Sequence, residues 1–195
     1  MKCKYCEAEI EETALKCKYC GEWVQERYSN IIPTEKLFIL SFFSAKIYDV
    51  FWFWKNLKAL RKHFFPELSV FLNYLGLFIP FLNIYFFWKF FDRIKIVAEK
   101  YEVRGFSPVL ATLYYFVSSA LIVVMGPWRD IIDLIFVVCC CIINTLVLME
   151  VQEVLNAVWR KVQPRQIVEE NLSLGEGILI IIGIVIWIFF VLSVL

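Results

Sequence analysis

The sequence predicts an all-helical membrane domain joined to a small N-terminal zinc ribbon, and three observations support this fold class. Hydrophobic residues make up 61% of the 195 residues, whereas soluble domains average about 45–50% by a similar count. The excess lies in residues 37–195, where long apolar runs alternate with short basic ones, while residues 1–36 are polar and charged. Four cysteines in the polar part have the spacing of metal ligands.

These four residues, Cys3, Cys6, Cys17 and Cys20, form two C-x2-C pairs within residues 1–27. Each pair can present two thiolates from one tight turn, and two such turns complete a closed tetrahedral zinc site. So short a head cannot fold by burial alone, and we expect Zn²⁺ to supply most of its folding energy. Redox-active cysteine pairs or disulfides are the alternative interpretation. Zinc thiolates favour a reducing, cytoplasmic compartment.

The head has no basic surface that would favour nucleic acid. Its four lysines are offset by four nearby glutamates, so phosphate binding is not expected. We expect the head to contact a protein partner or the protein's own loops. Residues 28–36 form a linker to the membrane domain.

The membrane domain, residues 37–195, contains five apolar stretches: 37–54, 68–91, 107–125, 131–151 and 177–195. The third and fourth are near bilayer length and are separated by a short turn, which predicts a helical hairpin. The fifth consists almost entirely of aliphatic and aromatic residues. Residues 152–172 are expected to form an amphipathic or loop segment along the cytoplasmic interface.

The first two stretches repeat each other at an offset of 34 residues, which aligns Trp54 with Trp88 and Lys46 with Pro80. Lys46 interrupts its apolar run with a charge, and Pro80 interrupts the other by removing a backbone donor. The repeat therefore predicts two broken helix units, each re-entrant or interfacial, because freed backbone groups at membrane depth need protein to cover them.

Basic clusters follow the first, second and fourth stretches. Lysines and arginines that flank membrane segments prefer the cytoplasmic side. If both broken units enter and leave on one side, all clusters lie in the cytoplasm with the head, stretches three to five cross the membrane, and the C-terminal end lies outside. Five full spans are the alternative, and they would export residues 55–67.

Lys46 and Asp49 are three residues apart, so they share a face of a helix. An acid and a base at membrane depth usually mark a functional site or a mutual pair. The interpretation that we favour is that both lie at the interface, where one side chain reaches the lipid headgroups. Five aromatic and basic residues fit an interfacial belt in contact with membrane lipids: Trp52, Trp54, Lys55, Trp88 and Lys89.

The segment KIYDVFWFWKN, residues 46–56, resembles the Gly-Ile-Tyr-x-x-Tyr-Trp-aromatic-aromatic-basic-Asn signature of a prokaryotic membrane family without an assigned function. Members of that family often carry zinc ribbons. Val151-Gln152 and Asn156 are similar to its later Val-Gln-x-x-x-Asn element, whereas Lys46 stands where the family has Gly. The resemblance implies a protein of a prokaryotic inner or plasma membrane and implies no activity.

The leading functional hypothesis is a membrane-anchored, non-enzymatic module whose cytoplasmic head mediates assembly or sensing through a partner or self-association. The alternative is an oligomeric pore, a transporter or a membrane-disrupting effector, for example in phage defence, because broken helices build ion sites in transporters. The chain has a single histidine and no phosphate loop or HExxH motif. We therefore predict no catalytic residues, and a lipid-modifying enzyme is the least favoured hypothesis.

Overall fold

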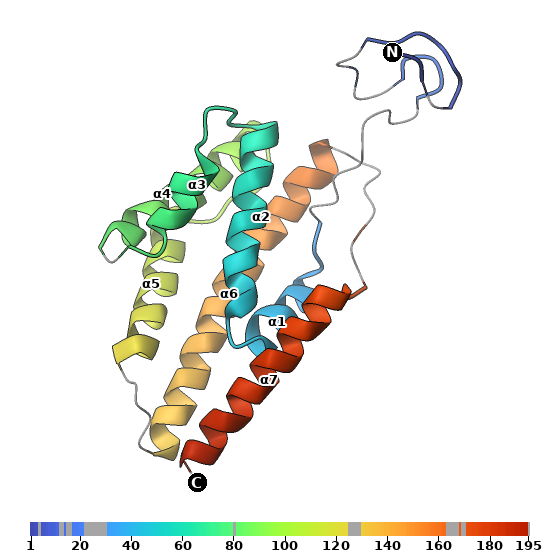
Figure 1. The fold of residues 1–195 in the computed structure, drawn as a ribbon. Coiled ribbons are helices and arrows are strands. Elements are labelled where there is room, and N and C mark those ends of the chain that lie inside the picture. The colour runs from blue at the N-terminus through green and yellow to red at the C-terminus, as the bar shows by residue number, and fades with distance from the viewer. Residues whose placement is uncertain are drawn as a thin grey trace.

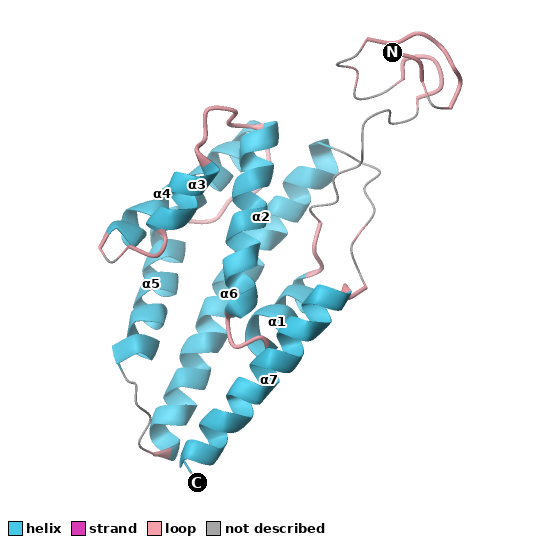
Figure 2. Cartoon of the chain, viewed as in Figure 1, coloured by secondary structure: helices cyan, strands magenta, loops and turns pink. Residues whose placement is uncertain are grey.

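The computed structural model describes residues 1–3, 5–11, 14, 17–21, 31–79, 81–124, 130–162, 168 and 171–194. Within these ranges the chain has seven helices and no strand (Figure 2), which confirms the predicted all-helical class. The helices are α1 (Thr34–Phe43), α2 (Ile47–His63), α3 (Val70–Gly76), α4 (Leu82–Lys100), α5 (Pro108–Val124), α6 (Ile131–Val162) and α7 (Leu174–Val194).

The first broken unit is a hairpin of α1 and α2, and α1 runs antiparallel to α6. The Asn156 side chain of α6 bonds both backbone groups of Ile32, at 3.1 Å to the nitrogen and 2.7 Å to the oxygen. Near the end of α1, Ser41 Oγ lies 3.2 Å from the hydroxyl of Thr145, which precedes Asn156 on α6. Helix α1 therefore runs along α6 from Asn156 toward the N-terminal half of α6.

Helix α2 then returns along α6 in the parallel direction. The Trp52 indole donates to Gln152 at 2.7 Å, and the His63 ring lies 5.2 Å from that of Trp159. The end of α2 thus lies where α6 ends, and α1 starts part-way along α6 on the side toward that end (Figure 1). Residues 44–46 form the tip of this first hairpin, beside the middle of α6.

The second broken unit, α3 and α4, forms a second hairpin against the first. Its helices are antiparallel, because Asn73 accepts a hydrogen bond from Arg93 at 2.7 Å and Gly76 packs on the Phe86 ring. The end of α4 lies at the end of α6, where Lys161 donates to the Tyr101 carbonyl at 2.7 Å. Both hairpins therefore open toward the same end of the bundle.

Left-handed backbone marks the break in each hairpin. Lys46 has φ 70° and immediately precedes α2, and Phe81 has φ 66° and immediately precedes α4. This conformation ends a helix, because the backbone no longer follows the right-handed path. The expected breaks are therefore present, and the one at Lys46 is where charge interrupts the apolar run. Pro80 lies outside the described residues.

Among the residues that the structure describes, two helices are long and apolar enough to cross a membrane, α6 and α7, and α5 is a shorter apolar helix. Helix α6 is longer than the predicted stretch 131–151, because it continues to Val162 and includes residues 152–162 rather than ending before a separate segment. The reason is packing: Leu155, Val158 and Trp159 are at most 1% exposed and continue the buried face of the helix. Tertiary contacts with α2 and α4 thus extend it by three turns.

The start of α7 is held by a reciprocal cap and an ion pair. Ser173 accepts a hydrogen bond from the Glu176 nitrogen at 3.2 Å, and the Glu176 carboxylate accepts one from the Ser173 nitrogen at 2.8 Å. This is a capping box. The same carboxylate lies 3.0 Å from the Lys36 ammonium, which ties α7 to the start of α1.

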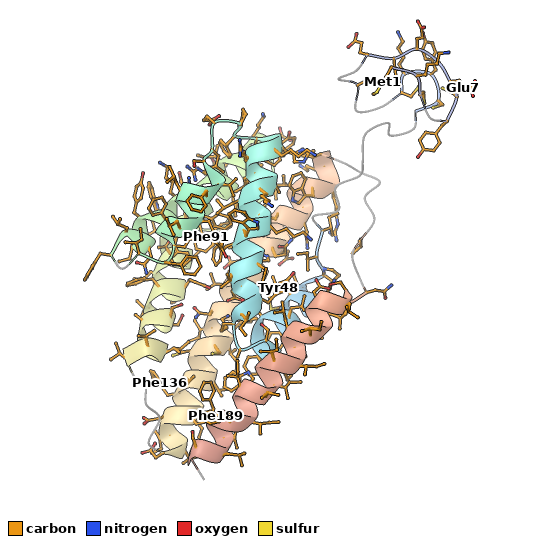
Figure 3. All side chains as sticks on the ribbon, viewed as in Figure 1. Met1, Glu7, Tyr48, Phe91, Phe136 and Phe189 are labelled. Carbon is orange, nitrogen blue, oxygen red and sulfur yellow. The ribbon has the colours of Figure 1, made fainter. Side chains whose placement is uncertain are left out.

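Further along, α7 crosses the first hairpin in close contact at Gly183. A β-carbon at Gly183 would overlap the backbone oxygen of Phe43 and the backbone carbons of Ser44. One turn later, the Trp187 indole donates to the Phe42 carbonyl at 3.0 Å. The opposite face of α7 is apolar and unpacked, as the side chains around Phe189 show (Figure 3).

We predict that Gly183→Ala lowers stability by about 1–3 kcal/mol, since the new methyl group must push α7 away from rigid backbone rather than a side chain. Thermal unfolding in detergent micelles measures this. Gly177→Ala is the matched control on the same helix: a β-carbon there would have nothing within 4 Å, and helix propensity favours alanine by about 1 kcal/mol. Equal unfolding temperatures for the two variants would contradict the close packing.

Candidate metal centre and buried ion-pair site

The four N-terminal cysteines form one cluster, whose sulfur atoms all lie within 4.8 Å of one another. Cys3 Sγ is 3.7 Å from Cys20 Sγ, and Cys6 Sγ is 3.6 Å from Cys17 Sγ. A disulfide requires about 2.0 Å between the two sulfur atoms. The cluster therefore consists of separate thiols that could hold a metal ion, as the spacing predicted.

Two equivalent turns position these cysteines. The Glu7 nitrogen donates to the Cys3 carbonyl at 3.0 Å, and the Gly21 nitrogen donates to the Cys17 carbonyl at 2.9 Å. Both donors have left-handed backbone, with φ 58° for Glu7 and 71° for Gly21. Glycine suits the second turn, whereas a glutamate in this conformation costs about 1–2 kcal/mol, so the first turn must be held by other interactions.

The backbone around the second pair favours a thiolate. Hydrogen bonds from the backbone of Cys20 and of Tyr19 lower the pKa of Cys17 to about 6, against an opposing effect of burial. The Tyr5 nitrogen donates to Cys3 Sγ at 3.5 Å. Thiolates are the form that binds metal. Ile10 packs beside the two buried cysteines, and Ala14 packs partly buried against this small cluster.

The structure brings Lys46 and Asp49 together at the tip of the first hairpin. The Lys46 ammonium lies 2.8 Å from Asp49 Oδ2, and the exposed fractions of the two side chains are 18% and 4%. A buried ion pair is stable only if hydrogen bonds satisfy its remaining donors and acceptors. The surroundings supply them from three helices.

Asp49 accepts a hydrogen bond from the Ser41 hydroxyl at 2.5 Å and one from the Tyr115 hydroxyl at 3.2 Å. The Lys46 ammonium donates to Ser41 Oγ at 3.0 Å and to Thr145 Oγ1 at 3.2 Å. Sequence reasoning placed Lys46 and Asp49 on one helix face, with a mutual pair as one possibility, and missed the three partners of the pair. They lie on α1, α5 and α6, and a single hydroxyl in an apolar helix carries no signal of its own.

Two cavities flank the ion pair, and Lys46 and Tyr115 line both of them. The larger, about 330 Å³, lies between α5, α6 and α7, where Ser119 and Asn144 add polar groups to an apolar wall. The smaller, about 100 Å³, also contacts Asp49 and is otherwise lined by aromatic and aliphatic residues of α2, α3 and α4. The charged pair therefore separates two spaces within the helical domain.

Trp52 departs from the predicted interfacial belt, because it is 0% exposed and lies in the core. Its indole donates to Gln152, whose amide donates in turn to Asn156 at 2.8 Å. Burial of an indole requires such a partner for its N–H group. The aromatic segment and the Val-Gln-x-x-x-Asn segment thus meet in one chain of hydrogen bonds. Because about a hundred residues separate the two segments, the sequence alone did not predict this contact.

The other members of the predicted belt lie nearer the surface. Trp88 is 39% exposed, and Lys89 donates to the Tyr85 hydroxyl at 2.9 Å. Trp54 is half-buried and packs edge-on against Tyr74, with ring centroids 4.8 Å apart. Lys55 is likewise only partly exposed.

Comparisons with protein-family models, with curated proteins and with solved structures found no match. The resemblance to the prokaryotic membrane family therefore stays a prediction, and any function has to be inferred from the sites themselves.

We predict that the purified full-length protein holds one metal ion per chain and that Cys17→Ser loses it, because three thiolates leave a tetrahedral site incomplete. Plasma mass spectrometry measures the stoichiometry. Cys139→Ser is the matched control, since Cys139 is an exposed thiol of α6 outside the cluster, and it should keep the metal. Equal metal content in the two variants would show that the cluster is not the site.

Proposed function

We propose that the head binds zinc and that the metal is structural. Zinc–sulfur bonds of about 2.3 Å place the sulfur atoms of a tetrahedral site about 3.8 Å apart. The observed separations of 3.6 and 3.7 Å fit that edge length. Four cysteine ligands leave no open coordination position for a substrate, so the site supports folding and recognition rather than catalysis.

We further propose that the chain is an integral membrane protein whose head lies in the cytoplasm. Basic residues gather at the ends of α2, α4 and α6, which lie together at one end of the bundle, as the contacts of His63 and Lys161 show. At the other end, α6 starts at Ile131 and has Asp133 but no basic residue in its first turn. This asymmetry supports a cytoplasmic basic end, two returning hairpins, and crossing by α5, α6 and α7 toward an external C-terminal end.

Membrane-impermeant maleimide tests this sidedness in a background with Cys139, Cys140 and Cys141 replaced by alanine. We expect Lys58→Cys to react only in inverted vesicles, because α2 returns to the basic end, and Asp130→Cys to react in intact cells. Both positions are exposed. Labelling of Lys58→Cys in intact cells would favour five full spans and contradict the returning hairpins.

The function that the geometry supports best is a membrane-anchored, non-enzymatic module whose head recruits a cytoplasmic partner protein. The observation that carries it is the pair of tyrosines on the two metal-binding turns. Tyr5 and Tyr19 each precede the second cysteine of a C-K-Y-C sequence and are 63% and 64% exposed. Exposed tyrosines on a rigid scaffold are typical of protein interfaces, because they offer large contact area at low cost in entropy.

We predict that deletion of residues 1–27 and the double variant Tyr5→Ala, Tyr19→Ala both lose the same cross-linked partner in cells. Membrane insertion and, in the double variant, metal content should stay unchanged, because neither tyrosine is a ligand. Lys2→Ala, which changes a third exposed side chain of the head, is the control and should keep the partner. An unchanged set of cross-links in the deletion variant would remove the basis for this function.

An oligomeric pore, transporter or membrane-disrupting effector is the second candidate. It is favoured by one observation, the charged pair between two cavities at the tip of a broken hairpin, where transporters place ion sites. Solute flux in liposomes that stops in Asp49→Asn would support it, and absence of flux at every protein density would oppose it.

A further inference from the structure

The Lys46 ammonium sits in a cage of oxygen atoms at the tip of the first hairpin. Its nitrogen lies 2.8 Å from Asp49 Oδ2, 3.0 Å from Ser41 Oγ and 3.2 Å from Thr145 Oγ1. A lysine ammonium has three protons to donate, so these three contacts satisfy it completely. The three oxygens come from α1, α2 and α6.

The hydroxyl protons of the cage point away from its centre. Ser41 donates its proton to Asp49 at 2.5 Å, and Thr145 donates its proton to the Cys141 carbonyl at 2.8 Å. Each hydroxyl has only one proton. Ser41 Oγ and Thr145 Oγ1, 3.2 Å apart, therefore both turn lone pairs toward Lys46. Two such oxygens repel each other unless a cation lies against both, so the hydroxyl groups are oriented for a positive charge.

The backbone position of Lys46 adds a second argument. Its φ of 70° is left-handed, a conformation that a residue with a side chain adopts at a cost of about 1–2 kcal/mol. The preceding helix, α1, points its C-terminal end at this tip, and the negative end of a helix dipole attracts a cation. A lysine is thus held in an unfavourable conformation at a point where positive charge is stabilised.

We propose that this cage is a binding site for a free monovalent cation of ammonium-like size, such as K⁺, and that Lys46 fills it with a tethered ammonium. Withdrawal of the Lys46 side chain leaves Asp49, Ser41 and Thr145 as ligands for the free ion. The two cavities beside Lys46 give its side chain room to withdraw and give the ion a path to the cage. The inference concerns binding and does not depend on the role of the head.

Lys46→Gly tests the proposal, because glycine accepts the left-handed backbone and removes the tethered charge. We expect the full-length variant in detergent to bind one radioactive Rb⁺ per chain, an accepted substitute for K⁺, and the wild type to bind Rb⁺ at least tenfold more weakly, because its tethered ammonium competes for the same cage. The Tm of the variant should rise by about 5–10 °C in KCl at a hundredfold excess over Kd, relative to choline chloride of equal ionic strength. The wild-type Tm should rise less at the same KCl concentration, because Lys46 already occupies the cage.

Second substitutions identify the ligands. Adding Asp49→Asn to Lys46→Gly should abolish Rb⁺ binding, and adding Thr145→Val should weaken it at least tenfold. Adding Thr112→Val is the matched control: Thr112 is a buried threonine of α5 that donates to Pro108 and lies outside the cage, so its loss should leave Rb⁺ affinity unchanged.

A folded Lys46→Gly protein, monodisperse and helical, that binds no Rb⁺ and ignores KCl would overturn the proposal. Should this variant unfold in choline, n-butylammonium decides the question, because it restores the lysine stem and charge as a separate molecule. Recovery of folded protein with n-butylammonium or K⁺ supports the cage, and failure with both overturns it. Loss of partner capture by the head, or absence of flux in liposomes, leaves these binding results unaffected.

Discussion

The buried pair of Lys46 and Asp49 constrains the rest of the helical domain. Two charges taken out of water are stable only where good geometry and added hydrogen bonds compensate for their lost hydration. Here the compensation comes from Ser41, Tyr115 and Thr145, so α1, α5 and α6 must meet at one point. The pair lies where α1 stops and the chain turns back as α2, and α7 then packs on that turn through a glycine. The arrangement of five helices is thus organised around one charged tip.

Much of this architecture could be predicted from the sequence, because the strongest signals were local. The two C-x2-C pairs predicted a cysteine cluster, and Lys46 predicted a break within an apolar run. Both depend on residues close together in the chain. The repeat at an offset of 34 residues likewise predicted that the first break would have a counterpart, which the structure places beside Phe81.

The remaining features depend on contacts between distant segments. Trp52 has the composition of an interfacial aromatic, and only its partner Gln152 on α6 shows that it belongs in the core. The continuation of α6 through Trp159 is another case, since the polar residues that suggested an interfacial segment alternate with a buried face that α2 and α4 cover. Periodicity within one segment cannot reveal which other helix will cover it.

The clamp on Ile32 has a mechanical consequence. Asn156 holds both backbone groups of this residue, and Ile31 and Ile32 are each only 2% exposed. A pull on the chain from the N-terminal side would therefore be carried first by this clamp on α6, nine residues before α1 reaches Ser41. Such a load would pass into α6, the longest of the described helices, before it reached the charged tip.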